Sequence, residues 1–360
     1  MEQFNISFSH SIFTVTAFQE RVLIAMITLI AIAVLQGVLY AVVPHKCGIR
    51  PVMEALSDMI LSPMIAKLNR RYRSKKALFV RGAIVFAVVL FITFVLIWLM
   101  QKGLTLWGAS LSDDASVPYH MYDDVLFLAL CLSPVWPLLI IARFGRLDHK
   151  DQKSKNNVLF LALARASYSN LIHHDESGLR RHAIKMLVMS FMFHVLIPIT
   201  VYIALGVWAL LLYTGLYTVI NCAGRHLYGG LFTWFSKMFL LPLLYVMQWG
   251  AAFIMYFASF LTGTTKLAKN TALIFKVSHL KANHVFEGGV ALGIMALALD
   301  KTLGGPYKDR NGEAVPAQWV GRSDATAQLS GKDIYRALYT VFVAQVMLLL
   351  LLCALYLYFA

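Results

Sequence analysis

The chain has 360 residues, of which 59% are apolar and 14% are charged, with a net charge of +14 and a mean hydropathy of +0.68. Soluble domains carry about 25% charged residues, so this composition excludes an ordinary soluble domain. The ten-residue segments of alternating polarity that are typical of a membrane β-barrel are missing from the sequence. We therefore expect an all-α, polytopic membrane helix bundle that the whole chain, 1–360, forms as a single integral membrane domain.

Six apolar runs are long enough to cross a hydrocarbon core, which takes roughly 20 helical residues. The first run follows a single arginine and is long enough to span, so we expect it to be retained rather than cleaved as a signal peptide. The predicted spans are residues 22–43, 82–100, 125–142, 186–220, 238–261 and 338–360.

The fourth run, 186–220, contains no Asp, Glu, Lys or Arg and is too long for one straight span. It includes Pro198 and Gly206, so we expect one crossing followed by a bent or re-entrant portion, with a cavity nearby. His194 in this run is a functional candidate, although a bond to a neighbouring backbone carbonyl would explain it equally well. The predicted spans have no acidic residue in their interiors, which argues against an ion pump or channel.

The basic residues alternate with the predicted spans. Segments 44–77, 143–185 and 262–337 carry eight, nine and ten Lys or Arg residues, whereas 101–124 carries one Lys and four Asp. Because basic loops stay in the cytoplasm, this pattern predicts three cytoplasmic segments and both chain termini outside. The same placement argues against nucleic-acid binding, which calls for one basic patch.

The stretch 299–312, LDKTLGGPYKDRNG, is a polar, tightly turning loop before the last span. Gly304 and Gly305 permit positive φ, and the backbone N–H groups of such a turn can hold an anion. Lys301 would add positive charge beside it. A surface turn that ends a helix would explain the same residues. The preceding VALGIMALAL, 290–299, is too short to span and fits a buried or interfacial helix.

A second polar stretch, LIHHDESGLRRH, occupies residues 171–182. His174 and Asp175 could bind a divalent metal, with Asp175 holding magnesium on a phosphate-bearing substrate. Alternatively, Asp175 or Ser177 caps the helix that follows.

In the order of these pieces, the chain resembles the CobD/CbiB family of cobalamin-biosynthesis membrane proteins. The C-terminal stretch ALALDKTLGGPYKDRNGEAVPAQWVG is similar to the family's Leu-Gly-Gly, Tyr, Gly, Pro and Gly signature. Near the start, GIRPVMEAL is similar to the family's His-Pro-Val motif, with Arg50 where the histidine is usual, and HHDESGL keeps Asp175 of a Gly-Arg-Asp motif. The residues that match the C-terminal signature are Leu303, Gly304, Gly305, Tyr307, Gly312, Pro316 and Gly321.

Members of this family condense adenosylcobyric acid with an aminopropanol phosphate, using ATP. The resemblance therefore implies a bacterial inner-membrane protein with a corrinoid substrate, ATP and magnesium as cofactors, and the lipid bilayer as partner. The family's acidic stretch falls here on residues that are not acidic, which removes the obvious metal ligands. These residues are Lys185, Met189, Ser190 and Phe193.

Three hypotheses about function follow. The chain is an ATP-dependent C–N ligase of the adenosylcobinamide-phosphate synthase type, a non-catalytic regulatory or sensor relative of that family, or a small-solute transporter. Residue chemistry and the resemblance together give one set of candidate substrate-binding residues. They are His174, Asp175, Lys301, Gly304, Gly305, Tyr307, Gly312 and Gly321.

Overall fold

The computed structural model is an all-α bundle with six helices long and apolar enough to cross a membrane, which confirms the predicted fold class. The six candidate spans are Thr16–Val42, Lys75–Leu99, Asp123–Gly145, Glu176–Leu205, Trp234–Leu261 and Gly331–Phe359. The structure describes residues 15–42, 48–69, 74–108, 120–146, 158–167, 169, 171, 175–223, 227–263, 285–308, 314–315 and 317–359.

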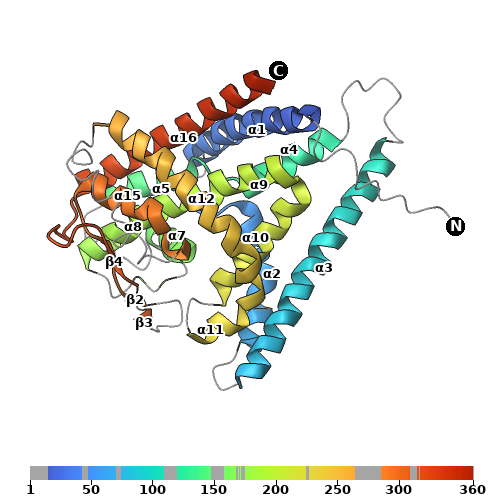
Figure 1. Ribbon diagram of the computed structural model, residues 1–360, viewed down its shortest axis with the longest axis horizontal. Helices are drawn as coiled ribbons and strands as arrows, with labels where there is room; N and C mark the ends of the chain where they lie inside the picture. Colours follow the sequence, from blue (N-terminus) through green and yellow to red (C-terminus); the bar gives the residue numbers. More distant parts are fainter. Residues whose placement is uncertain are drawn as a thin grey trace.

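Figure 1 labels the helices and most of the strands. The helices before the middle of the chain are α1 (Val15–Val42), α2 (Val52–Leu68), α3 (Lys75–Gly108), α4 (His120–Cys131), α5 (Trp136–Gly145) and α7 (Val158–Ser167). The helices after it are α8 (Glu176–Phe191), the π-helical turn η1 (Met192–Leu196), α9 (Ile197–Leu205), α10 (Val207–Cys222), α11 (Leu227–Phe232), α12 (Trp234–Leu261), the 3₁₀ turn η2 (Val285–Glu287), α15 (Gly289–Leu299) and α16 (Gly331–Phe359).

The first and last spans lie side by side and antiparallel (Figure 1). The rings of Phe18 and Phe359 contact each other with centroids 5.0 Å apart, so the start of α1 and the end of α16 are at the same end of the bundle. Apolar side chains are exposed along the outer helices, among them Val34, Phe91 and Phe253. Exposed apolar faces of this extent fit contact with lipid.

The fourth span, α8–η1–α9, is the centre of the bundle, with 94% of its most apolar window buried. This span begins at Glu176, about ten residues before the predicted start at residue 186, and it ends just before Gly206. Gly206 has φ 86° and ψ −174°, a conformation open essentially to glycine, and this residue separates α9 from α10. The broken helix of the predicted fold class therefore has its break at Gly206, whereas Pro198 lies in the first turn of α9 and continues the span.

The third span is also interrupted, because residues 132–135, between α4 and α5, are not helical. Gln36 of α1 repairs this gap. Its side-chain oxygen accepts the N–H groups of Val135 and Trp136 at 3.0 and 3.3 Å, and its amide nitrogen donates to the Leu132 carbonyl at 3.2 Å. Backbone groups at membrane depth must be satisfied by protein, which accounts for a buried glutamine inside a span.

The fourth span supplies a further bond to the same gap. Pro198 has no N–H, so it cannot bond to the His194 carbonyl four residues earlier. That carbonyl accepts the N–H of Ser133 at 3.2 Å instead. The carbonyl that Pro198 leaves without a helical partner therefore accepts an N–H group from the break in the third span.

Helix α2 comes from segment 44–77, where the sequence predicts only a basic cytoplasmic connection. In the structure it packs closely against α10, and its Glu54, Leu61 and Ile65 side chains are buried. Most of its residues are apolar, and burial against the bundle removes part of that surface from water.

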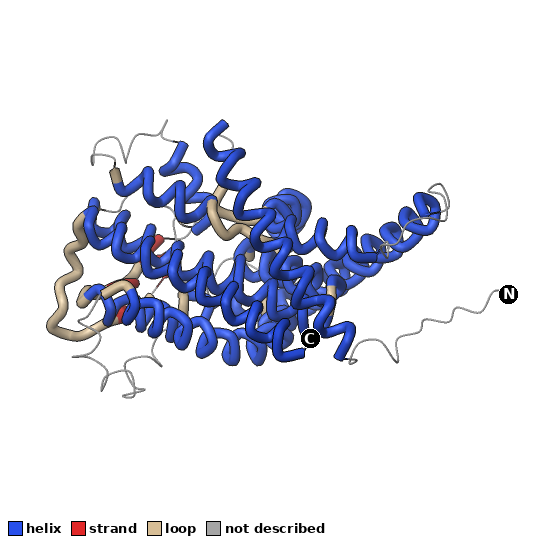
Figure 2. The backbone as a smooth tube through the Cα atoms, turned by 90° about the horizontal axis from the view of Figure 1, so that it is seen from above, coloured by secondary structure: helices blue, strands red, loops and turns tan. Residues whose placement is uncertain are grey.

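The predicted tightly turning loop is a two-stage antiparallel hairpin. Strand β1 (Leu303–Gly304) pairs with β4 (Trp319–Val320), and further out β2 (Tyr307–Lys308) pairs with β3 (Ala314–Val315). Figure 2 shows these strands at one end of the bundle, with α16 running away from them toward its C-terminal end. The preceding α15 is buried along all eleven residues, so the apolar stretch before the loop is a core helix.

Candidate functional site

The hairpin covers the first turns of α8. A small cavity, which we call the loop pocket, lies between the hairpin and α8. Its volume is about 100 Å³. The lining residues are Gly178, Arg181, His182, Lys185, Gly304, Gly305, Pro306, Tyr307 and Trp319.

One wall of the loop pocket is a face of α8. Asp175 caps this helix by accepting the N–H of Gly178 at 2.8 Å, so the capping interpretation of Asp175 is the one the structure shows. Arg181 and Lys185 are four residues apart and therefore project from the same face of α8. Arg181 also donates to the carbonyl of Ala327 at 2.7 Å, which ties α8 to the chain leading into α16.

The opposite wall is the Gly-Gly-Pro turn. Gly304 and Gly305 have φ 78° and 87°, so both use the left-handed conformation that the sequence predicts for them. A Cβ on Gly305 would lie 2.8 Å from the ring of Trp319, and one on Gly304 would lie 2.6 Å from the carbonyl oxygen of Gln318. Glycine is therefore needed for both backbone angle and space.

The floor of the loop pocket is a buried polar triad. Lys185 forms an ion pair with Glu287 of η2, and the Tyr307 hydroxyl donates to the other Glu287 oxygen at 2.9 Å. The Lys185 ammonium lies 4.6 Å from the centre of the Tyr307 ring. A charge removed from water needs this combination of a partner and further hydrogen bonds. The triad fixes the hairpin to the fourth span.

Two cationic side chains, Arg181 and Lys185, reach the pocket, and each has a carboxylate partner. The Arg181 guanidinium lies 5.1 Å from the centre of the Trp319 ring and 3.6 Å from Asp175, whose side chain is 70% exposed. The nine residues that line the pocket include two cations and no carboxylate, and Glu287 contacts them from behind. Such a site can hold an anionic group by hydrogen bonds and charge.

The structure brings together Gly304, Gly305 and Tyr307 of the predicted substrate-binding set. Gly321 lines a second cavity, of about 410 Å³. Trp319 lines both cavities. There Arg322 binds Asp324 by a side-chain hydrogen bond, which holds the pKa of Asp324 below its ordinary value. Lys301 ends α15 through a backbone bond to Ala296 and does not line the loop pocket.

The remaining predicted site residues concern the metal. His174 and Gly312 lie outside the described residues. Asp175, the residue proposed for magnesium, does not line the pocket, and its Oδ1 accepts the N–H that caps α8 and lies 3.6 Å from Arg181. Among the residues that the structure describes, no group of three or more His, Cys, Asp or Glu side chains is placed to hold a metal ion.

A second polar site was missed by the sequence interpretation. Nε2 of His194, in the π-helical turn, lies 2.8 Å from Oε2 of Glu54 on α2, and both side chains are at most 5% exposed. One turn along α2, Asp58 pairs with Arg50 at 2.9 Å and accepts the thiol of Cys222 at 2.9 Å. π-Helical turns of this kind are frequent at functional sites.

The predicted spans themselves contain no Asp or Glu, but this cluster places carboxylates of α2 among the helices of the bundle. The physical reason is that Glu54 and Asp58 belong to α2, which lies outside the apolar runs in sequence but inside the bundle in space. A signal for it was present, because the two carboxylates are four residues apart on one face of an otherwise apolar helix. The alternative for His194, a bond from its ring to a backbone carbonyl, is replaced by the contact with Glu54.

Comparison with known proteins adds no relative to this description. No protein-family model, no curated protein and no solved structure matches the chain. The class that the fold and site define is therefore a multi-pass helical membrane protein with a small pocket, lined by Arg181 and Lys185, at one end of its bundle.

Proposed function

We propose that this chain is a divergent CobD/CbiB-like membrane protein whose loop pocket binds the phosphate group of a small molecule. The observation that carries the proposal is the meeting of Arg181 and Lys185 with the positive-φ turn at Gly304 and Gly305. The small volume of about 100 Å³ suits one tetrahedral oxyanion, with the rest of the ligand outside.

The pocket supports binding better than ATP-dependent ligation. Phosphoryl transfer requires metal ions that neutralise the nucleotide phosphates. The residues lining the loop pocket do not fit a divalent cation, since no carboxylate oxygen is among them and Glu287 is bound by Lys185 and Tyr307. We therefore favour the non-catalytic sensor or regulatory relative over the synthase, and no step is assigned to ATP, magnesium or a corrinoid.

We further propose that the protein resides in a bacterial inner membrane with both termini outside and the loop pocket in the cytoplasm. The basic segments 143–185 and 262–337, which supply both walls of the pocket, support this orientation. A cytoplasmic phosphorylated metabolite would then have direct access to the pocket.

Binding is tested with the purified full chain in lipid nanodiscs, by titration calorimetry with aminopropanol phosphate and with unphosphorylated aminopropanol. We expect the phosphorylated compound to bind and the other to fail. Arg181→Gln should weaken binding about tenfold or more, as expected for loss of a charge-assisted hydrogen bond. Lys308→Gln, which removes an exposed cation of the same hairpin outside the pocket, is the matched control and should leave the affinity unchanged.

Equal binding of both compounds would rule out phosphate recognition. Complementation then separates the sensor from the synthase. A bacterial strain that lacks the synthase should remain deficient when it expresses this chain, and restored corrinoid synthesis would assign the ligase activity instead.

A further inference from the structure

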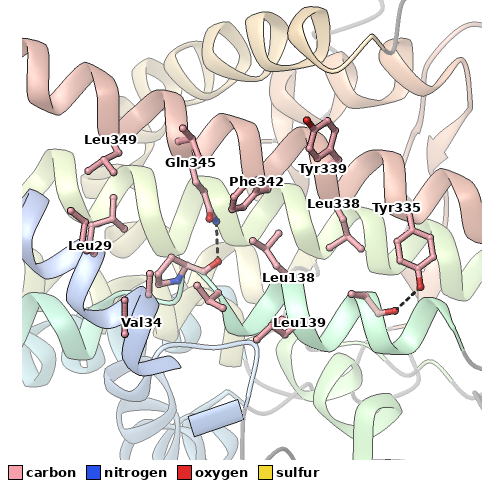
Figure 3. A pocket seen from close by; sticks show the side chains of 16 residues that line it. Leu29, Val34, Leu138, Leu139, Tyr335, Leu338, Tyr339, Phe342, Gln345 and Leu349 are labelled. Carbon is pink, nitrogen blue, oxygen red and sulfur yellow. Dashed lines mark hydrogen bonds between the residues drawn. The ribbon is translucent and has the colours of Figure 1, made fainter. Parts of the chain in front are cut away.

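The structure contains a second, larger depression that the proposed function does not use. It lies between α1, α16 and the α4–α5 junction, has a volume of about 590 Å³, and is shown from close by in Figure 3. We call it the α1–α16 groove. Its lining residues are Leu29, Ile30, Ala33, Val34, Pro134, Val135, Leu138, Leu139, Ala142, Tyr335, Leu338, Tyr339, Phe342, Gln345, Val346 and Leu349.

Two polar side chains of the groove form hydrogen bonds between its helices. Gln345 donates to the Pro134 carbonyl at 3.0 Å, and the Tyr335 hydroxyl donates to the Ala142 carbonyl at 3.2 Å (Figure 3). The Gln345 bond holds α16 onto the α4–α5 junction, and the Tyr335 bond holds it onto α5. What remains facing the groove is hydrocarbon.

The rims of the groove are exposed apolar side chains of the outer helices. Val34 on α1 and Tyr339 and Phe342 on α16 are each more than half exposed. All three belong to candidate membrane spans, so the medium that meets this groove is the acyl region of the bilayer. A volume of this size is in the range of small-molecule sites.

One end of the groove is basic. Arg146 follows Ala142 by four residues on the same face of α5, and its Nε donates to the Tyr335 hydroxyl at 3.1 Å. Lys332 precedes Tyr335 and Tyr339 by three and seven residues, which places it on the groove face of α16. Arg146 and Lys332 are both exposed. The groove therefore pairs an apolar length with a cationic end.

We propose that the α1–α16 groove binds an anionic phospholipid, with one acyl chain along α1 and α16 and the headgroup phosphate at Arg146 and Lys332. The argument is charge complementarity. Acyl chains fill an apolar groove inside a bilayer, and basic residues at the membrane surface attract anionic headgroups. The Tyr335 hydroxyl, between the two cations and the apolar wall, lies at the level expected for the ester region of the lipid.

The test uses the full chain in detergent and native mass spectrometry, with phosphatidylglycerol and phosphatidylcholine of identical acyl chains. We expect retained lipid, with phosphatidylglycerol preferred. The double variant Arg146→Gln/Lys332→Gln should lower that preference about fivefold for each basic residue removed. The matched control, Lys75→Gln/Lys76→Gln, removes two exposed lysines at the start of α3 and should change nothing.

A second measurement addresses the apolar part. Ala33→Trp fills the groove and should reduce retention of both lipids, and a phosphatidylglycerol with a photoactivatable acyl chain should crosslink to the peptide containing Phe342 in the wild-type protein. The proposal is overturned if the anionic preference survives in the Arg146/Lys332 double variant or if the crosslinks map elsewhere. It is also overturned if light scattering shows a dimer that Ala33→Trp converts to a monomer, because a second copy would then occupy the groove.

Discussion

Gly305 shows how much of the loop pocket rests on single residues. Its φ of 87° and the Trp319 ring 2.8 Å from any added Cβ both exclude a side chain. Gly305→Val should therefore lower the free energy of unfolding by about 1–3 kcal/mol from backbone strain alone, and should abolish ligand binding without preventing membrane insertion.

The thermal midpoint in detergent and the amount of protein in the membrane fraction measure the two effects of Gly305→Val separately. Gly37→Val is its control. Gly37 is helical, and a Cβ added to it would meet no atom within 4 Å, so this variant should keep the wild-type midpoint. Equal midpoints for the two variants would contradict the need for glycine at 305.

The Lys185–Glu287 pair is the second feature at this scale. Lys185→Met leaves the Glu287 carboxylate buried beside Tyr307 without its cation, and loss of one partner of a buried pair costs about 3–5 kcal/mol. The double variant Lys185→Met/Glu287→Leu removes both charges and should recover most of that loss. Thermal unfolding of the two variants measures the difference, and losses that add would show that the two side chains act independently.

At the scale of single residues, the sequence predicted a conformation correctly where neighbouring residues in the chain determine it. A Gly-Gly-Pro step requires special backbone angles wherever it occurs, so the conformations of Gly304 and Gly305 could be predicted. Lys185 and Glu287 are 102 residues apart in sequence and meet only in the folded bundle. No spacing rule within one helix or strand connects them.

Among the elements, the broken third span gives the clearest test. Gln36→Leu removes three hydrogen bonds to the α4–α5 junction, and each buried group left unsatisfied costs about 1–3 kcal/mol. Gln345→Leu removes one hydrogen bond to the same junction, the one that Gln345 donates to the Pro134 carbonyl. It should destabilise the protein less than Gln36→Leu does. Comparison of their thermal midpoints tests this order, and a larger effect of Gln345→Leu would refute the assignment of Gln36 as the main support of the break.

Hydropathy was sufficient to find the spans, because crossing a bilayer requires a run of apolar residues. It failed for α2, whose basic surroundings and modest length led us to expect an external connection. It also placed the start of the fourth span, at residue 186, about ten residues too late. The crossing begins at the charged residues after Asp175, since α8 is buried in protein there and its Arg180 and Arg181 bond to carbonyls of residues 329 and 327. Two-residue strands such as β1 and β2 are too short to leave a periodic pattern.

For the whole molecule, the charge pattern predicts which side each end faces. With six crossings and the basic segments inside, a reporter fused after Ala360 should be active only in its extracytoplasmic form. The antiparallel contact between Phe18 and Phe359 requires a reporter at the N-terminus to give the same result. Activity of a cytoplasm-dependent reporter at Ala360 would refute the six-span topology.

Function was the least predictable property at this scale. A motif resemblance names a family, but whether a site binds or reacts depends on which side chains meet, and Glu54 with His194 and Lys185 with Glu287 meet only in the folded bundle. The sequence predicted a substrate-facing turn at Gly304 and Gly305. It did not predict the helix face that completes the pocket or the buried carboxylate–imidazole pair.

The repair of the third span by Gln36 also constrains the order in which the bundle is assembled. An interrupted helix cannot stay in hydrocarbon while its own N–H and C=O groups lack partners, because each costs several kcal/mol there. The backbone groups of residues 132–135 find hydrogen-bond partners in two other spans. Gln36 of α1 is synthesised before this segment, and the His194 carbonyl is synthesised after it. The third span therefore needs the first span in place when it enters the lipid, and its last backbone hydrogen bond forms only after the fourth span has inserted. Its insertion is thus coupled to that of its neighbours.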